Sequence, residues 1–153
     1  MLEFKQIYGI EGYEKAKDLR EEVFMTEQGF SYDKDEYDEV SWHIVGYDKD
    51  LLIGCARVHK IDEYSYKIGR VAVKKEYRGG YIGDLLMKTL QDKIVTLGGI
   101  EAVVYAQVSA KGFYEKEGYT QDGEEFLVDG TAHAKMVLDL LKPHRTCRDC
   151  MKK

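Results

Sequence analysis

Tyr66-Lys-Ile-Gly-Arg-Val-Ala-Val-Lys-Lys-Glu-Tyr-Arg-Gly-Gly-Tyr-Ile-Gly-Asp84, with its continuation to Leu97, is the stretch that decides the fold. The apolar residues between positions 68 and 73 are mostly β-branched and are flanked by turn and charged residues, which predicts a buried strand. From Ile82 the apolar residues recur at helical spacing until Gly98-Gly99, which predicts a helix with one buried face. We expect the rest of the chain to support this junction.

The turn between the two elements, Arg78-Gly-Gly-Tyr-Ile-Gly83, is rich in glycine. Glycine permits positive φ and adds no side chain, so several backbone N–H groups can converge on an anion at the start of a helix. Neither the P-loop nor the dinucleotide fingerprint fits, because the first lacks its Gly-Lys-Ser/Thr ending and the second needs glycine where Arg78 stands. The glycines could simply turn the chain, but the guanidinium favours a phosphate-bearing ligand.

Composition indicates one domain with its own core, since the chain has 153 residues of which 44% are hydrophobic. A formal charge of −5 argues against a nucleic-acid surface, while the basic residues Lys74, Lys75 and Arg78 suit a small polyanion. No apolar run approaches the roughly 18 residues of a membrane span, and the N-terminus lacks the layout of a signal peptide. We therefore expect no membrane partner and a cytoplasmic location.

Cysteine content predicts reduced thiols, because Cys55, Cys147 and Cys150 cannot form a disulfide framework. The last two make a lone Cys-x-x-Cys, which is half of a zinc site. We expect no metal there, although a second chain could complete the site or the pair could be redox active. Pro143 marks the end of the folded body, so we expect a domain over residues 1–141 and a polar tail over 142–153.

The order of the expected elements predicts an α/β (α+β) fold, with a mixed central sheet of about seven strands flanked by three to four helices. Strand, helix and strand around the glycine turn imply a right-handed crossover between parallel neighbours. The acidic run 33–39 is either a solvated loop or one wall of a site that attracts a cationic substrate. The other expected elements are a strand at 2–7, a helix at 13–24, a hairpin of 40–47 and 51–59, a strand at 102–106, a helix at 109–117 and a hairpin of 119–128 and 131–140 turning at Asp129-Gly130.

Residues 71–83 resemble the acyl-coenzyme A loop of the GCN5-related N-acetyltransferases (GNAT), whose pattern is Arg/Gln-x-x-Gly-x-Gly/Ala, with Tyr81 in the place of the middle glycine. Residues 107–119 resemble the second cofactor segment of that family, with Gln107 in the place of an asparagine. Further segments resemble the ElaA-like and YjcF-like bacterial subgroup: Leu19-Arg-Glu-Glu-Val-Phe-Met-Thr-Glu-Gln28, Asp35-Glu-Tyr-Asp38 followed by His43, Ile68-Gly-Arg-Val-Ala-Val73, and Glu125-Phe-Leu-Val-Asp-Gly-Thr-Ala-His133.

The resemblance implies the GNAT fold and acetyl-coenzyme A as the acyl donor. It implies a bulge in the central strand whose amides polarise the thioester, and a pyrophosphate on the amides of the glycine turn. Tyr114 falls on the tyrosine that acts as the acid in the family, although it could be a half-buried structural aromatic. The implied donor contacts are Val71, Ala72, Val73, Arg78, Gly79, Gly80, Tyr81, Ile82, Gly83, Gln107 and Tyr114.

The acceptor amine needs a base, because a free alkyl ammonium has a pKa near 10.4. The resemblance places Glu27, Asp38, His43 and His133 near the acceptor cleft, and Glu27 is the first choice for the base and His43 the second. The alternatives are a structural role for each histidine, and a pairing of Glu27 with Arg70, which would orient rather than catalyse. The implied acceptor-side residues are Glu27, Asp38, Arg70 and His133.

The sequence thus predicts an N-acetyltransferase that moves an acetyl group from acetyl-coenzyme A to a primary amine of a small molecule. Direct attack in a ternary complex is favoured, because Cys55 has no base beside it in sequence. The alternative is a non-catalytic module that binds or senses acyl-coenzyme A, and a third hypothesis is a dimer linked by zinc through the tail. The identity of the amine, and whether the protein is a monomer or a homodimer, are left open.

Overall fold

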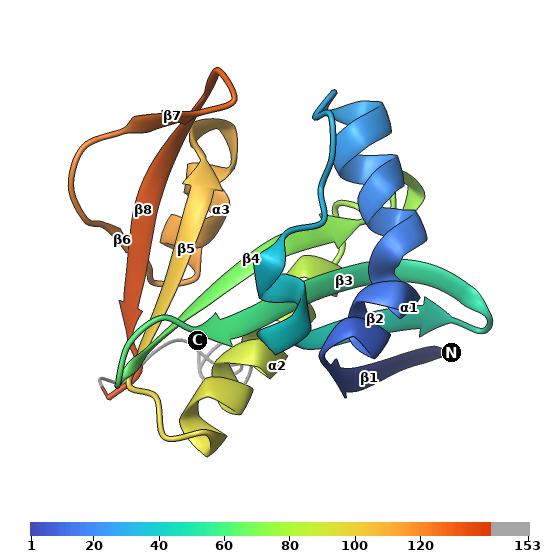
Figure 1. Cartoon of the computed structure of the whole chain (residues 1–153), viewed down its shortest axis with the longest axis horizontal. Helices are drawn as coiled ribbons and strands as arrows, with labels where there is room; N and C mark the ends of the chain where they lie inside the picture. Colours follow the sequence, from blue (N-terminus) through green and yellow to red (C-terminus); the bar gives the residue numbers. More distant parts are fainter. Residues whose placement is uncertain (142–153) are drawn as a thin grey trace.

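In the computed structural model, which describes residues 1–141, one mixed sheet carries α-helices on both faces (Figure 1). The elements in chain order are β1 (Leu2–Tyr8), α1 (Ile10–Arg20), the π-helix η1 (Glu21–Glu27), the 3-10 helix η2 (Glu36–Val40), β2 (Trp42–Asp48), β3 (Leu51–Lys60), β4 (Ser65–Val73), the 3-10 helix η3 (Lys75–Tyr77), α2 (Ile82–Thr96), β5 (Glu101–Gln107), the 3-10 helix η4 (Val108–Ala110), α3 (Lys111–Lys116), β6 (Thr120–Gln121), β7 (Phe126–Val128) and β8 (Thr131–Asp139).

The sheet has eight strands in the order β1-β2-β3-β4-β5-β8-β6, and β7 pairs with β8 off this path. Only β4 and β5 run parallel, and α2 connects them as the predicted crossover. The expected strand over 119–128 is instead two strands, because the chain turns between them at Gly123, whose φ is +88°. The predicted tight turn is confirmed, since Asp129 and Gly130 both have positive φ.

The two faces of the sheet have separate cores. On the α2 face, Leu86, Leu90 and Ile94 are fully buried against strand residues that include Ile68. Gly54 permits this close packing, because a Cβ there would lie 2.9 Å from Ile82. On the α1 face a smaller core is formed by Ala16, Leu19, Val23, Val45, Cys55 and Ala72.

A β-bulge interrupts the pairing of β3 with β4. Cys55 pairs with Ala72 and Arg57 pairs with Gly69, so two residues of β4 lie opposite one residue of β3. Arg70 is the bulged residue and has a φ of +52°, which is unusual for a side chain of this size. The bulge reverses the alternation of β4, because Ile68 belongs to the α2-face core and Ala72 to the α1-face core.

Candidate active site

Strands β4 and β5 part beyond their paired segment (Figure 1). The central cavity lies between their parted ends. The parallel pairing of the two strands ends at Ile68 and Val104, yet β4 runs on beside β3 and β5 runs on beside β8. The cavity has a volume of about 330 Å³ and is lined by residues 68–71 of β4 and 104–107 of β5. Beyond Ile68, the edge of β4 that faces β5 has no ladder partner, so its backbone groups are available to a ligand.

Tyr114 lies on the wall of this cavity and is 9% exposed. Its ring packs edge-to-face against Phe113 and Tyr119, and Gln91 donates a hydrogen bond of 2.7 Å to the Tyr119 hydroxyl. Burial raises the pKa of Tyr114 to about 12, so the phenol keeps its proton at neutral pH. The phenol of Tyr114 therefore lies on the cavity wall in its protonated form.

The glycine turn leads directly into α2. Gly79 has a φ of +87°, which only glycine adopts readily, and the first N–H groups of α2 have no acceptor within the helix. The Arg78 Nε donates to the carbonyl of Val73 at 2.8 Å, which ties the turn to the end of β4. Tyr81 is 73% exposed and leaves the turn open to solvent. These features fit a diphosphate held by backbone amides.

Glu27 pairs with Arg78, not with Arg70. A guanidinium nitrogen of Arg78 lies 2.8 Å from a Glu27 carboxylate oxygen, and Glu27 is not among the cavity-lining residues. The expected alternative pairing with Arg70 is therefore wrong. Arg70 instead contacts Asp33 at 2.8 Å and Asp35 at 3.1 Å.

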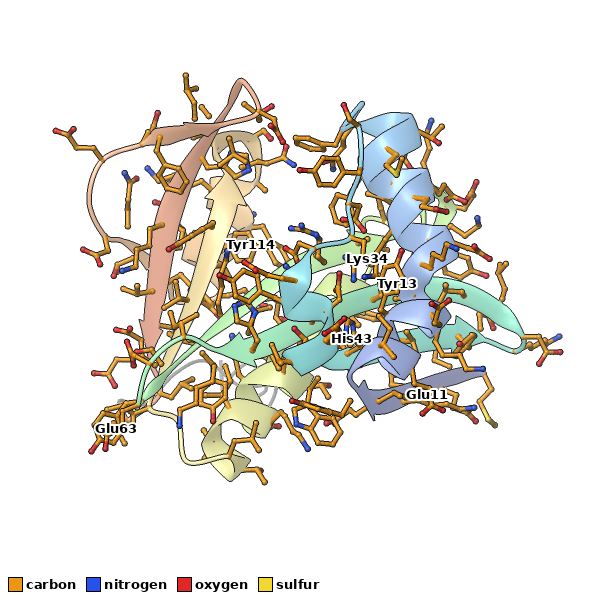
Figure 2. All side chains as sticks on the ribbon, in the orientation of Figure 1. Glu11, Tyr13, Lys34, His43, Glu63 and Tyr114 are labelled. Carbon is orange, nitrogen blue, oxygen red and sulfur yellow. The ribbon has the colours of Figure 1, made fainter. Side chains whose placement is uncertain are left out.

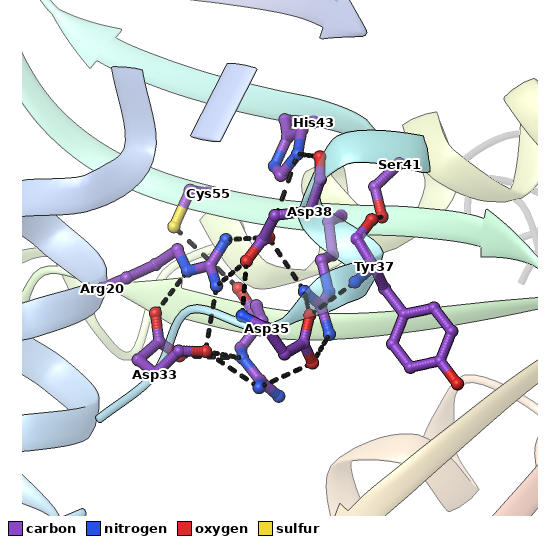
Figure 3. A network of polar contacts seen from close by, with 10 residues as sticks. Arg20, Asp33, Asp35, Tyr37, Asp38, Ser41, His43 and Cys55 are labelled. Atoms are coloured by element: carbon purple, nitrogen blue, oxygen red, sulfur yellow. Dashed lines mark hydrogen bonds and ion pairs between the residues drawn. The ribbon is translucent and has the colours of Figure 1, made fainter. Parts of the chain in front are cut away.

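A buried network of three arginines and three aspartates lies on the α1 face (Figure 3). Arg20, which is 1% exposed, contacts Asp33 and Asp38, while Arg57 contacts Asp35 and Asp38. Burial opposes the ionisation of Asp38, but hydrogen bonds from Arg20 and from the Asp35 backbone outweigh it and hold its pKa far below the usual range. The network fixes the loop between η1 and β2 over the sheet.

This network corrects the expectation for the acidic run 33–39. Asp33 and Asp38 are buried and paired with arginines, so the run is not a solvated loop. Asp33 lines the cavity, but Arg20 and Arg70 balance its charge, so it offers no free carboxylate to a cationic amine. Asp38, expected among the acceptor contacts, is fully buried and does not line the cavity. The exposed acidic residues of the run are Glu36 and Glu39.

The two candidate histidines occupy different environments. His43 is 1% exposed, lies outside the cavity lining, and donates from Nε2 to the carbonyl of Asp38 at 3.0 Å. Burial lowers its pKa, so it is neutral. His133 lines the cavity, and its Nδ1 lies 2.8 Å from the carbonyl of Thr131. Because a carbonyl oxygen only accepts, that contact assigns a proton to Nδ1.

The structure brings together part of the predicted site. Arg70, Val71, Gln107, Tyr114 and His133 all line the cavity. The glycine turn lies next to it at the start of α2. Glu27, Asp38 and His43 are not among the lining residues. Figure 2 shows the separation of His43 from Tyr114, since His43 lies by the strands near α1 and Tyr114 lies near β5.

Sequence reasoning missed Arg20 and Arg57 as the partners of the acidic run. Arg57 stands inside the apolar strand segment 51–59, and a charged residue in such a segment is rarely buried without a partner. That signal, together with the nearby aspartates, could have indicated a buried ion-pair network. It could not have indicated which arginine meets which carboxylate.

Some expectations concern residues outside the described range. Cys147 and Cys150 lie there, and so does the expected polar tail. Within residues 1–141, no group of three metal-ligating side chains is placed to hold a metal ion. None of the helices in that range is long and apolar enough to span a membrane.

The parted strands, the bulge and the glycine turn define the class of this protein as an acyltransferase, and comparisons with known proteins support it. Residues 11–140 match the acetyltransferase (GNAT) domain family. The Bacillus subtilis protein YjcF, described as an uncharacterized N-acetyltransferase, is 36% identical over 132 residues, which cover 82% of this chain and 94% of YjcF. Escherichia coli ElaA is 33% identical over 137 residues, covering 81% of this chain and 85% of ElaA. The chain belongs to the GNAT family of acetyltransferases.

Solved structures show the same fold. Escherichia coli ElaA superimposes with a TM-score of 0.80 at 28% identity, covering 90% of this chain and 99% of that one. A Lactobacillus plantarum protein described as an N-acetyltransferase gives a TM-score of 0.84 at 26% identity, covering 91% and 98%. A GNAT acetyltransferase of Elizabethkingia anophelis with acetyl-CoA bound gives 0.60 at 20% identity, covering 69% and 80%.

Proposed function

We propose that this protein transfers an acetyl group from acetyl-coenzyme A to a primary amine of a small molecule, by direct attack in a ternary complex. The observation that carries the proposal is the cavity between the parted ends of β4 and β5, with Tyr114 on its wall. The Elizabethkingia anophelis relative holds acetyl-CoA on the same fold, which supports this donor.

Donor binding uses backbone groups on two sides of the cavity. The unpaired edge of β4 around Val71 to Val73 offers amides to the thioester carbonyl and to the arm of the donor, which would lie between β4 and β5 as an added strand. The amides of residues 78–83 receive the diphosphate at the start of α2. Gln107, on the β5 side, lines the cavity and donates from Nε2 to Gln28 at 2.7 Å, so a donor arm that used this amide would replace that hydrogen bond.

The reaction needs a proton donor for the departing thiolate and a proton acceptor for the amine, and the cavity offers a candidate for each. Tyr114 gives its proton to the departing thiolate of the donor, because its raised pKa keeps it protonated. His133 receives a proton from the amine at Nε2, because the residue lines the cavity and its Nδ1 is engaged by the carbonyl of Thr131. Glu27 and His43 stay predictions as bases, the first held by Arg78 and the second buried.

An acyl-enzyme route through Cys55 has no support. The thiol is fully buried in the α1-face core, and burial raises its pKa to about 12, so it is not a thiolate at neutral pH. The route that remains is direct attack by the amine on the thioester. In this step the new C–N bond forms as the C–S bond breaks.

The test is the release of free thiol when the protein is incubated with acetyl-coenzyme A and a panel of small amines. We expect saturable thiol release with at least one amine, and mass spectrometry of protein treated with the donor alone should show no acetyl adduct. Cys55→Ala should retain turnover. Saturable donor binding without thiol release across the panel would contradict the proposed reaction, and a stable adduct on Cys55 would contradict the direct route.

A further inference from the structure

We propose that the acceptor carries a carboxylate as well as its amine, and that Lys67 and Arg70 bind this carboxylate beside the cavity. The inference rests on the proposed function and names the substrate class of the same site. It replaces the expectation of a purely cationic acceptor, because the carboxylates that would have attracted one are paired with arginines.

Lys67 is an ammonium without a counter-ion. It lies on β4 one residue before the parting of the strands, is partly buried, and holds its Nζ 4.0 Å above the centroid of the Tyr105 ring. Tyr105 lines the cavity, which places the Lys67 charge at the cavity's edge. Within residues 1–141, no carboxylate lies within ion-pair distance of it.

The bulge brings a second cation to the same face. Regular alternation would send the Arg70 side chain to the α2 face with Ile68, but the positive φ of Arg70 turns it to the α1 face, where Lys67 also points. Asp33 and Asp35 occupy Nε and Nη2 of Arg70, and Nη1 makes no hydrogen bond with any described residue. The Arg70 side chain is 31% exposed and lines the cavity, so this edge of the guanidinium is open to a ligand.

The surroundings of Lys67 have one positive charge in excess. The network pairs three arginines with three aspartates, and Lys67 adds a fourth cation with no fourth carboxylate. A single negative charge restores the balance, which favours a carboxylate over a doubly charged phosphate monoester. The pKa of Lys67 is lowered to about 8, first by burial and then by the nearby Arg57 and Arg70, with Asp35 opposing.

Two buried nitrogen atoms on β3 have no hydrogen-bond partner among residues 1–141. They are Nε of Arg57 and Nδ1 of His59, and His59 is the direct strand partner of Lys67. The Arg57 Nε is a donor, whereas His59 is neutral and its Nδ1 can donate or accept, because burial lowers the pKa of His59 to about 4. The strand beside Lys67 therefore supplies no anion that would balance its charge.

The experiment compares 4-aminobutyrate with butylamine, which share the amine and the chain and differ in the carboxylate. We expect the wild-type protein to prefer 4-aminobutyrate in kcat/KM by at least about tenfold, the size of one hydrogen bond to a charged group. Lys67→Met keeps the apolar stem over Tyr105 and removes the charge, so it should reduce this preference about tenfold by raising KM for 4-aminobutyrate.

The matched control is Lys135→Met. Lys135 lies opposite Tyr105 on β8 and pairs with the exposed Asp122, so its loss should leave the preference unchanged. Equal use of both amines by the wild-type protein, or a preference that survives Lys67→Met, would overturn the inference and leave the acetyl transfer standing.

If the protein binds the donor but releases no thiol with any amine, the result counts against the proposed function instead. The carboxylate site is then tested by calorimetry of the two acetylated products in the presence of coenzyme A. Tighter binding of N-acetyl-4-aminobutyrate than of N-butylacetamide, lost in Lys67→Met, supports the inference. Equal or undetectable binding of both overturns it.

Discussion

The Arg78 guanidinium lies 2.8 Å from the carboxylate of Glu27, so the glycine turn is held to the last residue of the π-helix η1. We predict that Glu27→Gln raises KM for acetyl-coenzyme A by about three- to tenfold, because Arg78 loses a charged partner at the phosphate site, and that kcat changes little. Steady-state kinetics measure both constants. Glu22→Gln is the control, because Glu22 lies on the same π-helix and pairs with Lys74. A hundredfold loss of kcat at constant KM would instead identify Glu27 as the base.

Tyr114→Phe removes one oxygen atom from the cavity wall. We predict a fall in kcat of about a hundredfold with little change in donor affinity, because the departing thiolate loses its proton source. The pKa of Tyr114 is raised to about 12, so the wild-type protein should keep this function to well above the ordinary tyrosine pKa of 10. Tyr119→Phe is the control, since Tyr119 packs on Tyr114 without lining the cavity. An equal effect of both variants would show that the loss arises from packing.

His133→Gln and His43→Gln separate the two histidines. We predict that the first lowers kcat about a hundredfold at unchanged donor KM, because the proposed proton acceptor of the cavity is lost, and that added imidazole restores part of the rate. The second should leave kcat within a few-fold and lower the melting temperature, because it breaks the hydrogen bond to the Asp38 carbonyl. The opposite pattern would restore His43 as the candidate base.

Asp38→Asn should destabilise the protein by about 3 to 5 kcal/mol, because Arg20 and Arg57 would keep buried charges without their shared partner. Urea unfolding measures the loss, and Asp35→Asn, at a partly exposed position, should cost less. The pKa of Asp38 is depressed in the folded state, so its contribution is present above the unfolded value near 3.9 and is lost as the pH falls below it. Asp38→Asn should therefore flatten the acid limb of the stability curve.

The preference for a carboxylate-bearing acceptor should depend on pH through Lys67. The pKa of Lys67 is lowered to about 8, so its positive charge is present below that pH and is lost above it. We predict that the ratio of kcat/KM for 4-aminobutyrate over butylamine falls between about pH 7 and about pH 10, while the amines' own titrations nearly cancel because both ionise alike. The ratio should be flat in Lys67→Met. A ratio that rises with pH in the wild-type protein would contradict this role.

Much of the fold was predictable because its signals are local. The apolar spacing after Ile82 predicted α2, the β-branched run before the turn predicted β4, and Asp129-Gly130 predicted the last hairpin, as the structure confirms. The family was predictable for a similar reason, since its motifs are short segments with fixed residue types. The split of 119–128 into two strands was missed, because each part is defined by its pairing with β8.

The sequence by itself determined the elements, the GNAT family and the residue types around the donor turn, because these depend on neighbours within a few positions of one another. Only the tertiary structure decided where the charges lie. The bulge at Arg70 reverses the alternation of side chains along β4. The bulge follows from the register between β3 and β4, which the hydrophobic period of the sequence does not reveal. The same packing pairs Asp38 with Arg20 and Arg57 and Glu27 with Arg78, and it leaves Lys67 without a carboxylate partner among residues 1–141.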